Sequence, residues 1–131
     1  MDNLASVHDI YRAFGQGDVA AIIERLAPDV VWEEDAVDHG VPWLNPGRGR
    51  EHVLSFFGVV GSQLDIRHFE VERLFQSDDQ VIASIRIEAL VRPTQKSFRD
   101  RELHLWTFDP KGQVSAFRHV LDTHQHYLAS R

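Results

Sequence analysis

The sequence contains no cysteine, which excludes disulfide bridges, thiolate metal ligands and a cysteine nucleophile. It has no apolar run that approaches the roughly 18 residues of a membrane span, and its first residues, MDNLASVHDI, lack the basic and apolar regions of a signal peptide. Positive charge is scarce. The formal net charge is −6, and acids interrupt the basic cluster at Lys96, Arg99 and Arg101. We therefore expect a cytoplasmic protein with neither a nucleic-acid nor a membrane partner.

The composition is that of an ordinary globular protein. The chain has 131 residues, of which 43% are hydrophobic and 26% are charged. This length supports one hydrophobic core but is too short for two domains. We expect a single domain over residues 1–131.

The first half of the chain carries helical patterns. Apolar residues recur at helical spacing in three segments: 4–14, 19–26 and 49–61. Residues 30–32 are β-branched and aromatic, which is typical of a strand. Residues 36–48 contain two prolines and two glycines and predict a long loop.

The second half of the chain carries a period of two. This pattern predicts four strands, separated by turn residues, at 65–76, 80–92, 97–108 and 113–124. Three helices followed by consecutive strands indicate an α+β fold with an antiparallel sheet.

Four local strings, taken in order, carry a family resemblance. They are YRAFGQGD (11–18), LAPDVVWEE (26–34), GRGREHVLSFF (47–57) and KGQVSAFRHVLDT (111–123). Together they resemble the SnoaL-like polyketide cyclases and ketosteroid isomerases of the nuclear-transport-factor-2-like superfamily. The resemblance implies a cystatin-like α+β roll, in which a cone-shaped, curved mixed or antiparallel sheet packs against three helices. It also implies a small apolar or aromatic ligand in the cone and a homodimer formed through the sheet.

The same resemblance implies roles for individual residues. It places Glu34 at the general-base position of the ketosteroid isomerases and His104 at the position of their hydrogen-bond-donating acid. Tyr11 lies one position from the tyrosine that stabilises the oxyanion in that family. Asp122 is the counterpart of the proton-transferring acid near the last strand of SnoaL-like cyclases.

Strand alternation predicts which side chains share a pocket wall, because residues i and i+2 lie on one face. His104 shares a face with Glu102 and Trp106, while Phe117 shares one with His119. The same rule pairs Trp32 with Glu34 on the first strand. The ligand-contacting residues expected from these patterns are Tyr11, Trp32, Trp43, Phe57, Glu102, Trp106, Phe117 and His119.

Such a pocket suits proton abstraction beside a carbonyl group. Glu34 would accept the proton, and His104 or Tyr11 would stabilise the developing oxyanion. This favours a cofactor-independent isomerase, cyclase or dehydratase acting on a small apolar carbonyl compound. The pair His124 and His126 is more typical of a surface than of a metal site, so no metal is expected.

Other interpretations of the pattern stay open. Asp100, Arg101 and Asp122 supply parts of the Asp-Arg-Asp arrangement of an epoxide hydrolase. A non-catalytic ligand-binding or dimerising domain also fits. Glu34 in a solvated acidic loop, His104 as a hydrogen-bonded core residue and Asp122 as a backbone cap are the structural alternatives.

Overall fold

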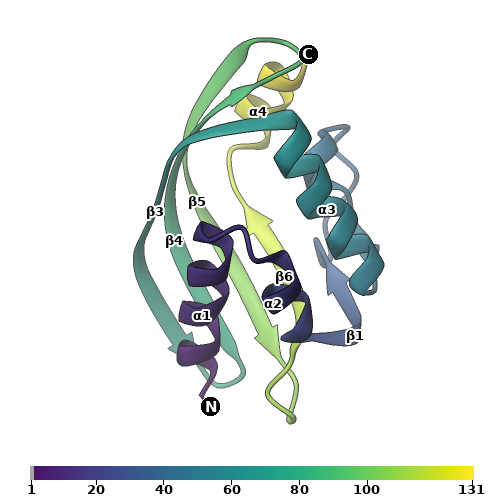
Figure 1. Cartoon of the computed structure of the whole chain (residues 1–131), viewed down its shortest axis with the longest axis vertical. Helices are drawn as coiled ribbons and strands as arrows, with labels where there is room; N and C mark the ends of the chain where they lie inside the picture. The colour runs from purple at the N-terminus through teal and green to yellow at the C-terminus, as the bar shows by residue number, and fades with distance from the viewer. Residues whose placement is uncertain (1) are drawn as a thin grey trace.

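The computed structural model describes residues 2–131 and places helices over one side of a curved sheet (Figure 1). The described helices are α1 (Asn3–Gly15), α2 (Val19–Glu24), the 3-10 helix η1 (Pro42–Leu44), α3 (Arg50–Gln63) and α4 (Thr123–Ser130). The described strands are β1 (Leu26–Trp32), β2 (Gly47–Arg48), β3 (Leu64–Ser77), β4 (Gln80–Val91), β5 (Lys96–Phe108) and β6 (Val114–Val120).

The strands form one mixed sheet in the order β2-β1-β6-β5-β4-β3. Neighbouring strands are antiparallel except β1 and β6, which run parallel. The sheet curves without closing, and α1, α2 and α3 lie against its concave side (Figure 1). The expected α+β fold is confirmed, and the parallel β1–β6 pair makes its sheet mixed.

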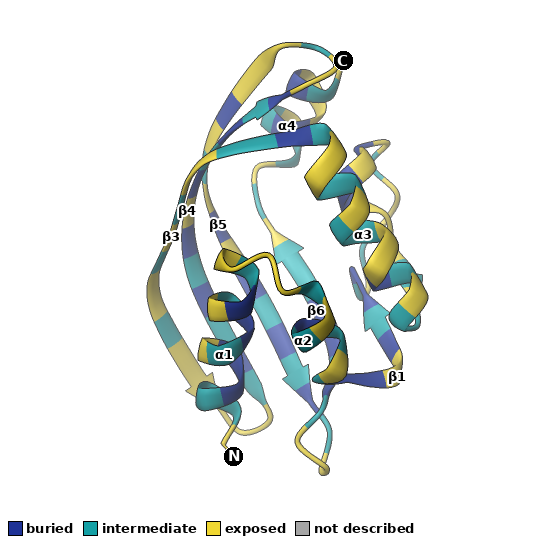
Figure 2. Cartoon of the chain, in the orientation of Figure 1, coloured by how far each residue is buried: buried dark blue, intermediate teal, exposed yellow. Residues whose placement is uncertain are grey.

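Alternation along β4 shows why the sheet has one buried face. Every second residue of this strand is buried: Val81, Ala83, Ile85, Ile87, Ala89 and Val91. The residues between them are half-buried or exposed (Figure 2). A strand with this pattern fits a sheet whose concave face packs against helices while the other face meets water.

The second expected helix ends earlier than its apolar pattern suggests. Asp18 caps α2 through a 3.2 Å hydrogen bond from the Ala21 N–H, but the helix stops at Glu24. Pro28 lies within β1, where the pairing with β6 shifts register between Leu26 and Val31. Proline has no N–H to donate, so an irregular position in the ladder tolerates it.

The expected strand at 113–124 is wrong at its end. It stops at Val120, and the described chain continues into a fourth helix that the sequence patterns did not predict. Asp122 caps this helix by accepting a 3.2 Å hydrogen bond from the N–H of Gln125. The expected loop at 36–48 likewise contains η1 and β2.

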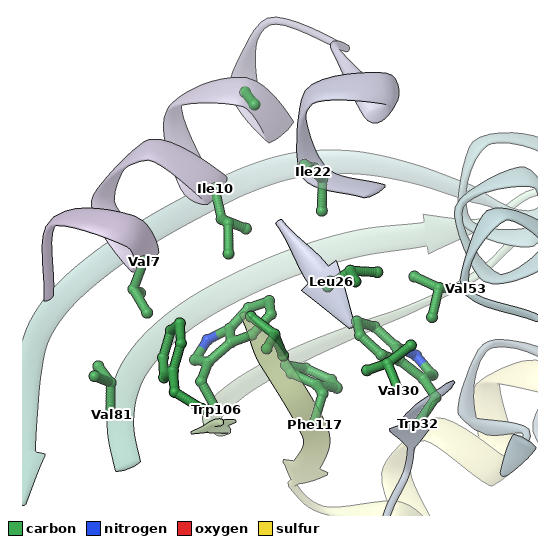
Figure 3. Close-up of a cluster of buried hydrophobic side chains, with 13 residues drawn as sticks. Val7, Ile10, Ile22, Leu26, Val30, Trp32, Val53, Val81, Trp106 and Phe117 are labelled. Atoms are coloured by element: carbon green, nitrogen blue, oxygen red, sulfur yellow. The ribbon is translucent and has the colours of Figure 1, made fainter. Parts of the chain in front are cut away.

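Two groups of buried apolar residues hold these layers together. One lies beneath α1 and α2 and includes Val7, Ile10, Ile22 and Trp32 (Figure 3). The other joins η1 and α4 to β4 and includes Trp43 and Ala129. No helix within residues 2–131 is both long and apolar enough to cross a membrane.

Candidate active site

A small cavity lies between the concave face of the sheet and the helices. Its volume is about 70 Å³, and its lining is mostly aromatic and aliphatic. A water molecule needs roughly 10–15 Å³ by a comparable measure, so the space suits a small ligand. The ionisable side chains in the lining are Tyr11, Glu102, His104, His119 and His126.

Strand register places the central polar residues together. Glu102, His104 and Trp106 lie on the buried face of β5 because they are two positions apart. Across the antiparallel ladder, His104 pairs with His119 of β6, and Trp106 pairs with Phe117. The rings of His104 and His119 meet edge to face, with their centroids 4.9 Å apart.

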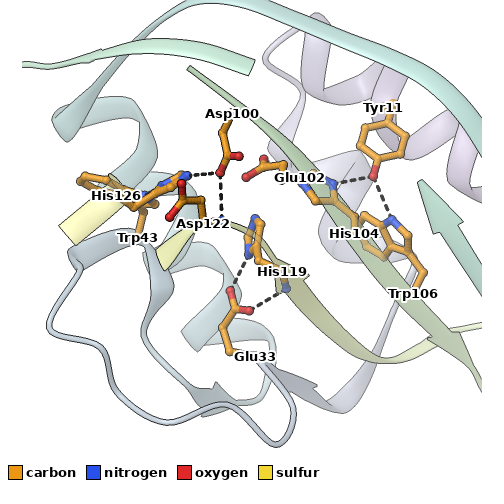
Figure 4. A network of polar contacts seen from close by, with 10 residues as sticks. All are labelled: Tyr11, Glu33, Trp43, Asp100, Glu102, His104, Trp106, His119, Asp122 and His126. Carbon is orange, nitrogen blue, oxygen red and sulfur yellow. Dashed lines mark hydrogen bonds and ion pairs between the residues drawn. The ribbon is translucent and has the colours of Figure 1, made fainter. Parts of the chain in front are cut away.

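His104 belongs to a chain of three hydrogen bonds (Figure 4). Its Nε2 lies 3.0 Å from Oε1 of Glu102, and its Nδ1 lies 2.6 Å from the hydroxyl of Tyr11. The indole N–H of Trp106 donates to that same hydroxyl at 3.0 Å. These bonds connect α1 to β5 through the wall of the cavity.

The protonation state of this chain follows from burial. Burial lowers the pKa of His104, outweighing the hydrogen bond and charge of Glu102, so the ring is neutral. Burial alone would raise the pKa of Glu102, but the His104 hydrogen bond and the neighbouring histidines lower it to about 2. An ionised Glu102 accepts a hydrogen bond from the Nε2–H of His104. Nδ1 therefore accepts the hydrogen bond that Tyr11 donates.

His119 has a carboxylate partner on its other side. Nδ1 of His119 lies 2.5 Å from Oε2 of Glu33, and its backbone N–H donates to Oε1 at 2.8 Å. Burial disfavours the charged ring, but the Glu33 carboxylate outweighs it and raises the pKa of His119. Within residues 2–131, Nε2 of His119 has no hydrogen-bond partner. Figure 4 shows this ring standing between Glu33 and Glu102.

His126 has partners on both nitrogens. The indole N–H of Trp43 donates to Nδ1 at 3.0 Å, and Nε2 donates to Oδ2 of Asp100 at 2.9 Å. Burial lowers the pKa of His126, outweighing the carboxylates of Glu102 and Asp100. Asp100 also accepts the backbone N–H of Asp122 at 3.2 Å. This second network fastens α4 to β5.

Trp32 carries a donor without a partner. The residue is 1% exposed and lines the cavity. Its Nε1 is the one buried side-chain polar atom within residues 2–131 that forms no hydrogen bond. A buried donor of this kind is normally satisfied by water or a ligand.

Most of the residues that line this cavity lie in a segment that matches a known family. A family model described as a SnoaL-like domain matches residues 7–117. The chain belongs to the SnoaL-like family. No curated protein matches it.

Solved structures agree with this assignment. The SnoaL-like chain is similar to an NTF2-like protein from Burkholderia thailandensis E264, with 29% identity and a TM-score of 0.86 over 100% of this chain and 98% of that chain. An NTF2-like protein from Burkholderia xenovorans LB400 shares 21% identity, with a TM-score of 0.86 over 98% of this chain and 95% of that chain. TerC, co-crystallized with polyporic acid, shares 18% identity, with a TM-score of 0.79 over 97% and 96% of the two chains. The last two likenesses concern the fold alone, which hosts many functions.

Most of the residues predicted from the sequence come together in this SnoaL-like cavity. Its lining contains His104 and all of the expected ligand-contacting residues: Tyr11, Trp32, Trp43, Phe57, Glu102, Trp106, Phe117 and His119. Their roles in binding or catalysis stay predictions. The sequence patterns missed Glu33 and His126, which complete the two networks.

The expectation that Glu34 shares the pocket with His104 is wrong. The cavity lining leaves Glu34 outside, and the buried acid is Glu33, which is 3% exposed. The ladder between β1 and β6 ends at Trp32, and Glu33 takes a left-handed backbone conformation with φ of 57°. This conformation breaks the two-residue alternation that had assigned Glu34 to the face of Trp32.

Asp122 also lies outside the cavity lining, where it serves as the N-cap of α4. The Asp-Arg-Asp arrangement of an epoxide hydrolase is therefore not formed. Arg101 points to the opposite face of β5 from Asp100 and pairs there with Glu72 at 3.2 Å. A signal for the cap was present, since an aspartate followed by helix-forming residues is typical of a helix start.

Proposed function

We propose that this SnoaL-like protein catalyses proton transfer on a small, largely apolar carbonyl compound bound in the cavity, with His119 as the general base. The observation that carries the proposal is the unoccupied Nε2 of His119, whose opposite nitrogen is held by the Glu33 carboxylate. A histidine with one free nitrogen in a mostly apolar pocket is suited to accept a proton from carbon.

Glu33 has two effects on this base. Its hydrogen bond to Nδ1 fixes the tautomer, so the lone pair is on Nε2. Its charge stabilises the imidazolium that forms when Nε2 takes a proton, as the raised pKa of His119 indicates. Glu33 does not line the cavity and acts through His119, so it is a positioning residue.

His104 supports the other half of the reaction. When a carbon–hydrogen bond beside a carbonyl breaks, its electron pair moves onto the carbonyl oxygen. A neutral His104 with its proton on Nε2 offers an N–H to that oxygen, in competition with Glu102. The hydrogen bond from Tyr11 holds His104 in this tautomer. Return of the proton to another atom completes an isomerisation.

The test is proton exchange, because it requires abstraction alone. Small cyclic ketones and 1,3-diketones are incubated in D₂O with the metal-free protein, and loss of the α-proton signal is followed by NMR. His119→Gln should slow exchange by about 10² to 10⁴. His124→Ala, an exposed histidine on α4, should leave the rate unchanged.

Two outcomes would count against the proposal. Exchange that is equally fast in His119→Gln would remove His119 as the base. Saturable binding of these ketones without exchange would favour the non-catalytic ligand-binding alternative.

A further inference from the structure

Three potential metal ligands converge in the cavity wall. Glu102, His104 and His119 each offer one ligand atom, and these atoms lie within 4.8 Å of one another. Glu102 and His104 are buried, with 3% and 5% of their surfaces exposed. Two histidines and one carboxylate form a ligand set typical of transition-metal sites that keep open positions.

The sheet holds these ligands in place. Glu102 and His104 lie two residues apart on β5, and His119 faces His104 directly across the ladder. Side chains on neighbouring strands are positioned more rigidly than side chains on loops. The three ligands therefore need little reorganisation to meet around one ion.

Each histidine also has a partner on the nitrogen that faces away from Glu102. Nδ1 of His104 contacts the hydroxyl of Tyr11, and Nδ1 of His119 contacts the carboxylate of Glu33. Metal-bound histidines almost always have such an outer partner, because it fixes the ring and raises the basicity of the ligating nitrogen. The arrangement leaves Nε2 of both rings for an ion.

The spacing of two ligand atoms fits a metal centre. Nε2 of His104 and Oε1 of Glu102 are 3.0 Å apart. Two ligands at right angles around an octahedral ion, each about 2.1 Å from it, are also about 3.0 Å apart. A divalent ion would replace the hydrogen-bonded proton between these two atoms.

The charge of the site favours a cation. Glu33 and Glu102 are both 3% exposed. Within residues 2–131, their ion-pair partners are the histidines His119 and His104 rather than lysine or arginine. Buried carboxylates are costly unless a positive charge compensates them, and a divalent ion would compensate both.

We propose that Glu102, His104 and His119 bind one divalent first-row transition-metal ion, with its remaining coordination positions open to the cavity. Binding moves the proton of His104 from Nε2 to Nδ1, where it is donated to the Tyr11 oxygen. That oxygen then accepts from both His104 and Trp106, which fills its two lone pairs.

This site goes beyond the proposed proton transfer and competes with it. The ion and the proton both require Nε2 of His119, so a metal-loaded protein has no free base at this position. The proton transfer proposed above therefore belongs to the metal-free protein.

The neighbouring group formed by Asp100, Glu102 and His126 also places three ligand atoms within 4.8 Å. It is a poorer site, because Nδ1 of His126 faces an indole N–H, which can only donate. The Trp43 indole donates a hydrogen bond to Nδ1, and the proton on Nε2 is donated in a hydrogen bond to Asp100. Ligation through Nε2 would move this proton to Nδ1, where it would meet the Trp43 N–H, whereas the Tyr11 oxygen can accept the corresponding proton of His104.

Calorimetry on the untagged, EDTA-treated full chain tests the proposal directly. ZnCl₂ should bind with one ion per chain, and CoCl₂ should give a visible absorption band that saturates at the same ratio. His119→Gln and Glu102→Gln should abolish both signals. Glu33→Gln keeps all three ligands and should weaken binding by about 10- to 100-fold. The exposed His124→Ala variant should bind as the unaltered chain does.

The possible results separate the metal site from its alternatives. Absence of saturable Zn²⁺ binding to the unaltered chain would overturn the site. Binding that survives in His119→Gln but is lost in His124→Ala would overturn it too, by placing the ion on the surface. If the ligand variants do not fold, Glu33→Gln and the cobalt spectrum of the unaltered chain still decide. Proton exchange is measured in EDTA, so either proposal can fail while the other stands.

Discussion

His119, whose side chain is 10% exposed, and the buried His126 lie in one cavity wall, and each is hydrogen-bonded to a carboxylate. Their pKa values move in opposite directions: burial is outweighed by Glu33 at His119, whereas burial prevails at His126. His126 uses both nitrogens to join Trp43 and Asp100. Nε2 of His119 has no hydrogen-bond partner in the described part of the chain. The His126 network fastens α4 to β5, and the other network contains the histidine that we propose as the general base.

The largest expected effect tests the fastening role. His126→Ala leaves Asp100 and the Trp43 indole without their shared partner and opens a gap in the core. We expect the free energy of unfolding to fall by about 3 kcal/mol, as for other broken buried pairs. Urea denaturation measures this change. His124→Ala, on the exposed side of α4, should stay within about 0.5 kcal/mol of the unaltered protein. A His126→Ala cost as small as this control would contradict the structural role.

The second effect tests the chemical role. Glu33→Gln keeps a hydrogen-bond acceptor for His119 but removes the charge that stabilises the imidazolium. We expect proton exchange to slow by about 10- to 100-fold. The acidic limb of the pH–rate profile, along which the rate rises as His119 loses its proton, should move to lower pH, because loss of the charge lowers the pKa of His119.

Glu34→Gln is the matched control for that experiment. Its side chain lies outside the cavity lining, so neither the rate nor the pH profile should change. If Glu34→Gln and Glu33→Gln slowed exchange equally, the assignment of the acid would have to be reversed.

The smallest effect concerns the dependence of stability on pH, to which the two histidines contribute on opposite sides of the ordinary histidine pKa. The native state binds the His119 proton more tightly than the unfolded state does. Its contribution is therefore present below the ordinary histidine pKa and is lost as pH rises through the raised value. His126 acts oppositely, and stability is lost as pH falls from the ordinary pKa through its lowered value.

Two variants separate these contributions in urea denaturation between about pH 5 and pH 9. His119→Gln should remove the loss on the alkaline side, and His126→Gln should reduce the loss on the acidic side, to which the lowered pKa of His104 also contributes. His119 faces Glu33, Glu102 and His104, and His126 faces Asp100, Glu102 and His119. If the free energy of unfolding of both variants changed with pH in the same way, the carboxylates would not shift the pKa values of the two histidines in opposite directions.

The sequence predicted much of the cavity wall, because regular strands obey alternation. Glu102, His104 and Trp106 lie on one face of β5, as their spacing required. Alternation failed at the first acidic residue after β1, where the chain leaves the sheet. No local feature of this acidic run indicates that Glu33 turns inward while Glu34 stays outside the cavity.

The fourth helix illustrates a second limit. A period of two continues past Val120 in the sequence, but pairing with β5 ends there. The Asp122 cap and the contact of His126 with Trp43, which are far apart in the sequence, favour the helix instead.

Local spacing and composition were sufficient to predict the α+β class and the buried face of β5. Only the tertiary structure decided which acid faces which histidine. That choice depends on a left-handed residue at the end of β1 and on the β5–β6 register, which bring Glu33, His119 and Glu102 together across the sheet. Hydrogen bonds between residues so distant in the chain leave no local pattern, so the proposed base and the ligands of the proposed ion emerge only from the folded protein.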